Sequence, residues 1–381
     1  MVPNKRIRAA LTLAIFLVVA ALSSYAFAAH ASRPFCDDAR AQVQCWSDAI
    51  IHTYATNGMS AAFKMFDELA VSEPRFSETC HSVMHALGKK FYDVSATKKL
   101  QELPPEIEYC SYGFFHGLME AYVTEHGSEI GAREACSSLS NSVSDGSPFL
   151  FFDCVHGLGH GIVDQLVSRT STDSLRILSL GLSACRGLSK DDQEREYCES
   201  GVFMELGTLY ADSNYPLQLD KENPYAFCES QSDAVTRRAC TSGLNTAVSA
   251  IAHQHFLLAA HRAEKITDNA DASNAVRQLA KVHAMQVMSA ETDKFVIAMC
   301  YRLQTRLQRS CIEGFIAGRI RSSDPQKGYR DSLSLCEDPS LRSTDTGACM
   351  HAIFNVMAQY RRSQVAEACK NAPPQYAQLC S

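Results

Sequence analysis

The chain has 381 residues, of which 46% are hydrophobic, 9% aromatic and 20% charged, as in an ordinary globular protein longer than one typical domain. It carries 36 lysines and arginines against 42 aspartates and glutamates, a formal net charge of -6. This composition excludes a disordered or collagen-like chain. The acidic balance argues against binding to phosphate backbones or anionic lipids, so we expect no nucleic-acid partner.

Residues 1–31 have the pattern of a cleaved secretory signal peptide. Lys5, Arg6 and Arg8 precede an uncharged apolar run over residues 9–22, and small-x-small triplets such as Ala26-Phe27-Ala28 follow. The run is shorter than the ~20 residues of a membrane-spanning helix, and an uncleaved anchor is the alternative. Without the three basic residues, 33 basic side chains stand against 42 acidic ones, a net charge of -9. We expect a periplasmic or secreted protein with no membrane span after signal removal.

Residues 32–78 predict an N-terminal helical hairpin. Ile50, Ile51 and Tyr54 have helical spacing, Asn57-Gly58 predicts a break, and the second helix is expected to end near Pro74.

Sixteen cysteines follow the signal, and the closest two are nine positions apart. This spacing excludes a C-x2-C zinc ribbon or redox centre. An even number of cysteines in an exported chain indicates disulfides, and the local spacing favours bonds between neighbours, although other connectivities stay open. The expected pairs are Cys36 with Cys45, Cys80 with Cys110, Cys136 with Cys154, Cys185 with Cys198, Cys228 with Cys240, Cys300 with Cys311, Cys336 with Cys349, and Cys369 with Cys380.

The second cysteine of most pairs begins a repeated helical segment. Glycine stands three residues after Cys110, Cys154, Cys198, Cys240 and Cys311, and the first four of these segments begin 44, 44 and 42 residues apart. A fixed period of this length predicts stacked helix pairs, and the glycines would let neighbouring helix axes approach closely. We expect an all-α fold, a solenoid of antiparallel helix hairpins cross-linked by local disulfides. His-rich repeats would cover 79–240 and C-terminal repeats 241–381, with an extra helix near 274–291.

These helix-turn-helix units, with Leu206-Gly207-x-x-Tyr210 in one of them, resemble secreted tetratricopeptide-like repeats whose cysteine pairs link adjacent helices. The resemblance covers the chain after about residue 45, and the period exceeds the ~34 residues of that class. It implies the architecture and a protein or peptide partner. It implies no catalytic residue.

Histidines recur at matching positions of successive repeats, as the pair His81 and His85, the pair His156 and His160, and the single His116. The i, i+4 spacing places each pair on one helical face, where two imidazoles can bind one divalent transition metal ion. The predicted metal ligands are His81, His85, His116, Glu120, His156, His160 and Asp164. Two alternatives stay open: the histidines are structural residues copied with the repeat, or they line a metal-free ligand pocket.

Other features indicate less. His253, His255 and His261 predict solvated or packing roles, the charged run over residues 191–196 predicts a solvated loop, and Glu205 either joins the histidine site or supports packing. The chain contains no G-x-S-x-G, Walker, dinucleotide-binding or H-E-x-x-H motif. The sequence therefore predicts an exported helical-repeat binding or scaffold protein with a His-lined ligand or metal site. The alternative is a metal-dependent enzyme that uses the same histidines.

Overall fold

The computed structural model describes residues 36, 42–73, 75–95, 109–127, 131–142, 148–169, 173–210, 217–286, 295, 297–322, 328–339, 341–360 and 364–380, and among these residues helices occur without strands. The helices, in chain order, are α2 (Gln42–Asn57), α3 (Met59–Ser72), α4 (Phe76–Ser95), α5 (Tyr109–His126), α6 (Ala132–Ser142), α7 (Pro148–Arg169), α8 (Ser174–Leu188), α9 (Asp192–Leu209), α10 (Ala226–Glu229), α11 (Ala234–Gly243), α12 (Asn245–Ile251), α13 (Phe256–Ala263), α14 (Asn269–Gln286), α16 (Thr305–Ser322), α17 (Gly328–Cys336), α18 (Ser343–Tyr360), α19 (Val365–Asn371) and the 3-10 helix η4 (Pro374–Cys380). The predicted all-α class is confirmed.

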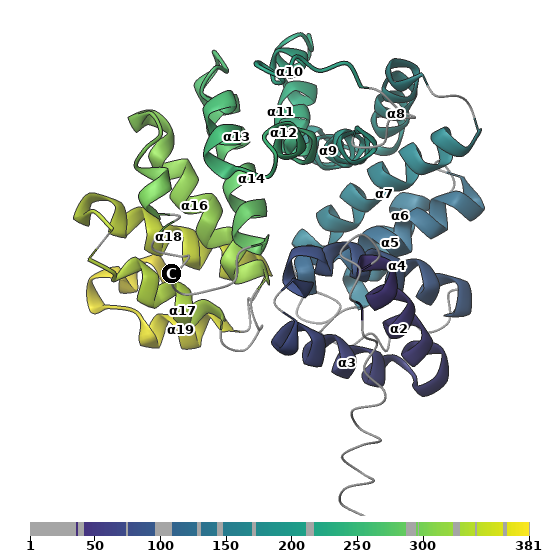
Figure 1. Cartoon of the computed structure of the whole chain (residues 1–381), viewed down its shortest axis with the longest axis horizontal. Coiled ribbons are helices and arrows are strands. Elements are labelled where there is room, and N and C mark those ends of the chain that lie inside the picture. The colour runs from purple at the N-terminus through teal and green to yellow at the C-terminus, as the bar shows by residue number, and fades with distance from the viewer. Residues whose placement is uncertain are drawn as a thin grey trace, which may run out of the picture.

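The longer helices pack against one another in chain order. The series runs α4, α5, α7, α9, α11, α14, α16 and α18, each in contact with the next, and shorter helices such as α6, α8, α13 and α17 flank it (Figure 1). The predicted N-terminal hairpin is α2 and α3, which pack on each other and on α4. The helix expected near 274–291 is α14, which begins five residues earlier.

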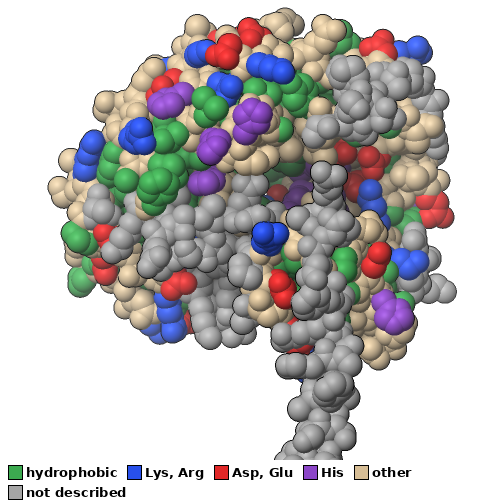
Figure 2. Space-filling view, in the orientation of Figure 1, with side chains coloured by type: hydrophobic (Ala, Val, Ile, Leu, Met, Phe, Trp, Pro, Cys, Tyr) green, Lys and Arg blue, Asp and Glu red, His purple; other side chains and the backbone are tan. Residues whose placement is uncertain are grey.

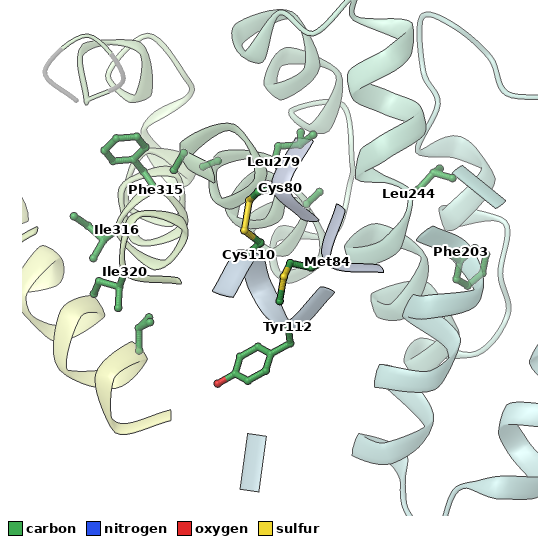
Figure 3. Close-up of a cluster of buried hydrophobic side chains, with 14 of the residues drawn as sticks. Cys80, Met84, Cys110, Tyr112, Phe203, Leu244, Leu279, Phe315, Ile316 and Ile320 are labelled. Atoms are coloured by element: carbon green, nitrogen blue, oxygen red, sulfur yellow. A yellow bond between two sulfur atoms is a disulfide. The ribbon is translucent and has the colours of Figure 1, made fainter. Parts of the chain in front are cut away.

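The series of long helices curves until its later members meet its earlier ones. Helix α14 contacts α4, α16 contacts α5, and α18 contacts α7. At this closure, Arg321 of α16 forms a buried 3.3 Å ion pair with Asp153 of α7, and its Cζ atom lies 5.6 Å from the ring centroid of Tyr112 on α5. Figure 3 shows Tyr112 and the Cys80–Cys110 bond opposite the apolar side chains Ile316 and Ile320. The curved series lines a central cavity of about 900 Å³ that is open to solvent.

Glycines allow the long helices to approach each other at backbone distance. A Cβ atom at Gly117 of α5 would lie 1.9 Å from the His85 carbonyl oxygen of α4, and one at Gly201 of α9 would lie 2.0 Å from the His156 carbonyl oxygen of α7. No side chain fits at such distances, so glycine is required there. The close approach predicted from the repeated glycines is confirmed, and it brings the histidine-bearing helices together.

Seven of the eight expected cysteine pairs form disulfides, and each bond joins neighbours in the sequence. The bonded pairs are Cys36 with Cys45, Cys80 with Cys110, Cys136 with Cys154, Cys185 with Cys198, Cys228 with Cys240, Cys300 with Cys311, and Cys336 with Cys349. The eighth expected pair, Cys369 with Cys380, involves a side chain outside the described residues. The predicted pairing is therefore confirmed for seven pairs.

The disulfides also bear on the compartment of the protein. Since cytosolic reductants keep thiols reduced, this set of bonds indicates an oxidising compartment. The predicted signal peptide lies outside the described residues. Among the helices that are described, none is both long and apolar enough to span a membrane.

The charged run over residues 191–196 was expected to be a solvated loop, and this expectation is wrong. Asp191 caps α9 by accepting a hydrogen bond from the Glu194 N–H, and the helix begins at Asp192. Glu194 is 5% exposed and receives two hydrogen bonds from the Arg133 guanidinium, at 2.6 and 2.8 Å. An N-cap and a bidentate ion pair therefore order a segment whose composition is typical of a loop.

Peptide mapping under non-reducing conditions should recover Cys185 linked to Cys198 and Cys228 linked to Cys240. Each pair joins adjacent helical segments, with Cα atoms 5.6 and 5.4 Å apart. Mass spectrometry of the digested protein, purified from an oxidising compartment, checks this pairing. A link across the series, such as Cys136 to Cys336, would contradict the packing order of the helices.

Candidate metal centre

Three consecutive long helices bring the predicted ligands to one wall of the cavity. Helix α4 carries His81 and His85, α5 carries His116 and Glu120, and α7 carries His156, His160 and Asp164, and all seven side chains line the cavity. Figure 2 shows histidine and acidic side chains inside the hollow near the middle of the molecule. The i, i+4 spacing orients the side chains on each helix, and the close helix packing brings the three sets together.

The first group of imidazoles combines α4 with α5. The Nε2 atom of His85 lies 3.0 Å from Nε2 of His81 and 3.2 Å from Nδ1 of His116. Ligand atoms of these three residues all lie within 4.8 Å of one another, so the group could hold a metal ion.

The second group combines α5 with α7. The Nε2 atoms of His156 and His160 lie 3.1 Å apart, and His116 completes a group whose ligand atoms again lie within 4.8 Å of one another. His116, His156 and His160 are all buried, at 4, 8 and 2% exposure. His116 therefore belongs to both groups.

The other four imidazoles use Nδ1 for contacts outside the cluster. Nδ1 of His81 donates to the Cys110 carbonyl oxygen at 2.6 Å, and Nδ1 of His85 lies 3.0 Å from a Glu120 carboxylate oxygen. On α7, Nδ1 of His156 lies 2.8 Å from the Ser200 hydroxyl oxygen, and Nδ1 of His160 lies 2.7 Å from a Glu205 carboxylate oxygen. With Nδ1 bound to an acceptor, each ring turns the lone pair of Nε2 into the cluster.

Two lone pairs that face each other at about 3 Å repel unless a cation lies between them. Such a cation would be either a proton or a metal ion. Two nitrogens bound to one ion at ~2.0–2.1 Å are separated by roughly 2.9 Å at right angles and roughly 3.3 Å in a tetrahedron. The Nε2 separations of 3.0 and 3.1 Å fall within this range.

Burial keeps most of these imidazoles neutral. Removal from water, together with the nearby His85, lowers the pKa of His81 to about 3. Burial lowers the pKa of His116 and His156 well below the usual value, with neighbouring imidazoles adding to the effect. His160 differs: burial opposes its charge, but the bond to Glu205 outweighs burial and raises its pKa. A neutral imidazole is the form that ligates metal ions.

The carboxylates of the cavity wall are held by Lys89. Its Nζ atom lies 2.7 Å from Glu120 and 3.1 Å from Asp164. Although burial opposes the charge of Glu120, its interactions with His85 and Lys89 lower the pKa of the Glu120 carboxyl. A third group that could hold a metal ion consists of Glu120, His160 and Glu205. Asp164 is close to the cluster without belonging to any of the three groups formed by described residues.

Sequence reasoning missed several residues of the site. Ser200, on α9, orients His156, and its place next to the repeated Gly201 was the only local signal for it. Lys281 and Arg321 line the same cavity from α14 and α16, because the series closes on itself. Burial lowers the pKa of Lys281 to about 7, and the positive charge of Arg321 adds to this shift.

We found no match to this chain among protein-family models, curated proteins or solved structures. The resemblance to tetratricopeptide-like repeats therefore rests on the residue pattern alone.

Proposed function

We propose that this chain is an exported metalloprotein whose histidine cluster binds a divalent transition metal ion at the wall of the central cavity, where the metal takes up a small anionic molecule. The ligands are His81, His85, His116, His156 and His160, with Glu120, Glu205 and Asp164 balancing charge. The observation that carries the proposal is the orientation of the four Nε2 atoms, each directed inward by a contact at its own Nδ1.

The metal interpretation explains more than the interpretation of the histidines as structural residues. A structural imidazole gains stability when its ring nitrogens bond to neighbouring groups, and a buried nitrogen without a partner costs about 1–3 kcal/mol. Yet Nε2 of His116 is buried with no hydrogen-bond partner among the described residues, and the two Nε2 pairs face each other. Metal ions bound within the histidine groups would satisfy these nitrogens.

The cavity favours a small molecule over the protein or peptide partner that the repeat pattern suggested. Its volume of about 900 Å³ lies in the range of ~300–1,000 Å³ that is typical of small-molecule sites. A solenoid wound tightly enough for its turns to touch would present its concave surface to such a molecule. The metal ion would act as a Lewis acid toward the bound molecule. The same arrangement would therefore suit the alternative function, a metal-dependent enzyme.

The part of the cavity wall formed by α14 supports the negative charge of the ligand. Lys281 lines the cavity; the charge of Asp153 acts on it, but among the described residues no carboxylate forms an ion pair with its ammonium group within 4.0 Å. Its charge is close enough to affect the pKa of His156. A carboxylate or phosphate that spans from the metal ion to Lys281 would pair with both cations.

Elemental analysis tests the metal. Protein purified from an oxidising compartment should contain at least one equivalent of a divalent transition metal. Apo-protein should bind Co²⁺ with the visible absorption bands of nitrogen ligation. A histidine cluster that leaves Co²⁺ with the spectrum of the aqueous ion would overturn the proposal.

Inorganic phosphate tests the ligand class. Phosphate should change the visible spectrum of the Co²⁺-loaded protein, and Lys281→Met should weaken its binding about tenfold while leaving Co²⁺ stoichiometry unchanged. Lys64→Met is the matched control, because Lys64 is an exposed lysine of α3 outside the cavity. Equal phosphate affinity in the two variants would remove Lys281 from the ligand site.

A further inference from the structure

We infer that the centre is dinuclear, with His116 as a bridging ligand that binds one metal ion through Nδ1 and a second through Nε2. This inference rests on the proposed function and adds the number of ions and their connection.

His116 lies between two histidine pairs on two different helices. Its Nδ1 edge faces α4, with Nδ1 at 3.2 Å from His85 Nε2. Its opposite edge faces α7, since a Cβ atom at Gly157 would lie 3.4 Å from His116 Cδ2. Nε2 is bonded to Cδ2, is buried, and has no hydrogen-bond partner among the described residues. One imidazole thus presents its two nitrogens toward two sets of ligands.

Each ion then has three imidazole ligands. The first is held by His81, His85 and Nδ1 of His116, and the second by His156, His160 and Nε2 of His116. Both groups have ligand atoms within 4.8 Å of one another. Three protein ligands leave an open position on each ion for a ligand from the cavity, as in catalytic zinc sites. Two metal ions bridged by one imidazole ring lie about 6 Å apart, which is wider than the ~3.5–4 Å between the ions of common two-metal sites.

The proton balance follows from the bridge. A neutral imidazole has one N–H, and a ring that binds two ions has none. Binding of the second ion therefore releases the remaining ring proton of His116 to solvent and leaves an imidazolate. Two dications favour this anion, and the same cavity wall carries the carboxylates of Glu120, Glu205 and Asp164, which offset the remaining charge.

The Glu120 carboxylate lies near one ligand of each of the two proposed ions. Its Oε1 atom lies 3.0 Å from Nδ1 of His85, a ligand of the first ion, and 3.9 Å from Nδ1 of His160, a ligand of the second. A carboxylate that accepts from metal-bound imidazoles increases their basicity. Glu120 is 2% exposed, so water screens the charge of its carboxylate only weakly.

Copper binding to the full disulfide-bonded protein tests the bridge. The apo-protein should take up two Cu²⁺ per chain, and electron paramagnetic resonance at low temperature should show much less signal than two isolated ions would give, because an imidazolate couples their spins. His116→Ala should restore the ordinary signal of uncoupled Cu²⁺ for whatever copper it retains. His52→Ala, which removes an exposed histidine of α2, should behave as wild type.

The outcomes separate the two proposals. One Cu²⁺ per chain with a full signal overturns the dinuclear centre and leaves the proposed function standing, whereas no copper overturns both. Two uncoupled ions overturn the bridge. These results come from the wild-type protein, so the test holds even if His116→Ala fails to fold.

Discussion

Replacing His116 and His160 together by alanine should abolish stoichiometric metal binding while leaving the helical content nearly unchanged. Apparent binding free energies of nitrogen- and sulfur-ligated zinc are about 10–16 kcal/mol, shared among three or four ligands. Removal of two ligands should therefore cost about 5–11 kcal/mol and lower the affinity by at least about four orders of magnitude. Circular dichroism should change little, because seven disulfides and the helix packing hold the scaffold.

The matched control removes two histidines outside the cluster. His52 and His255 are exposed, and neither lines the central cavity. Their double alanine variant should keep the full metal content, measured by elemental analysis after dialysis against a weak chelator. Full retention of metal by the variant that lacks His116 and His160 would contradict this assignment of ligands.

Gly117→Ala should strongly destabilise the fold. The new Cβ atom would lie 1.9 Å from the His85 carbonyl oxygen, and backbone cannot rotate aside as a side chain can. Helices α4 and α5 must separate, which disturbs their shared core and moves His85 away from His116. We expect a loss of about 3–5 kcal/mol in the free energy of unfolding, measured in denaturant, together with weakened metal binding.

Gly187→Ala is the control for this substitution. Gly187 lies in the last turn of α8, and a Cβ atom there would have no heavy atom within 4 Å. This variant should keep or slightly raise stability, since alanine is the better helix former. Equal unfolding midpoints for the two variants would show that α4 and α5 do not pack at backbone distance.

Local patterns in the sequence predicted the local parts of the structure. The cysteine spacing predicted seven disulfides between adjacent segments, among them Cys136 with Cys154 and Cys300 with Cys311, because such bonds form between neighbours in the chain. The repeated glycines predicted close helix contacts because these contacts, too, form between helices that follow one another in the chain. The histidine spacing placed each set of imidazoles on one helical face. Glu205 was harder to assign, because it is one residue out of register with the repeated histidine position.

Contacts between segments that are distant in the chain left no such pattern in the sequence. Arg321 and Asp153 are 168 residues apart, and no periodicity relates them. The closure of the helix series, and with it the cavity and the placement of Lys281 in the same cavity as the histidines, therefore followed only from the three-dimensional structure. The charged run at 191–196 was misassigned for a related reason, since its partner Arg133 is 61 residues from Glu194.

The position of the disulfides has a mechanical consequence. The described bonds join cysteines at most 30 residues apart, so none of them crosses from α5 to α16 or from α7 to α18. The described cross-links thus join adjacent segments of the chain, whereas the junction between the two ends of the series is held by non-covalent contacts, among them the buried ion pair of Arg321 with Asp153. Tension across this junction would therefore be opposed by packing and charge, and by none of the described disulfides. Separation of the two ends of the series, which would widen the cavity, would thus leave every described covalent cross-link intact.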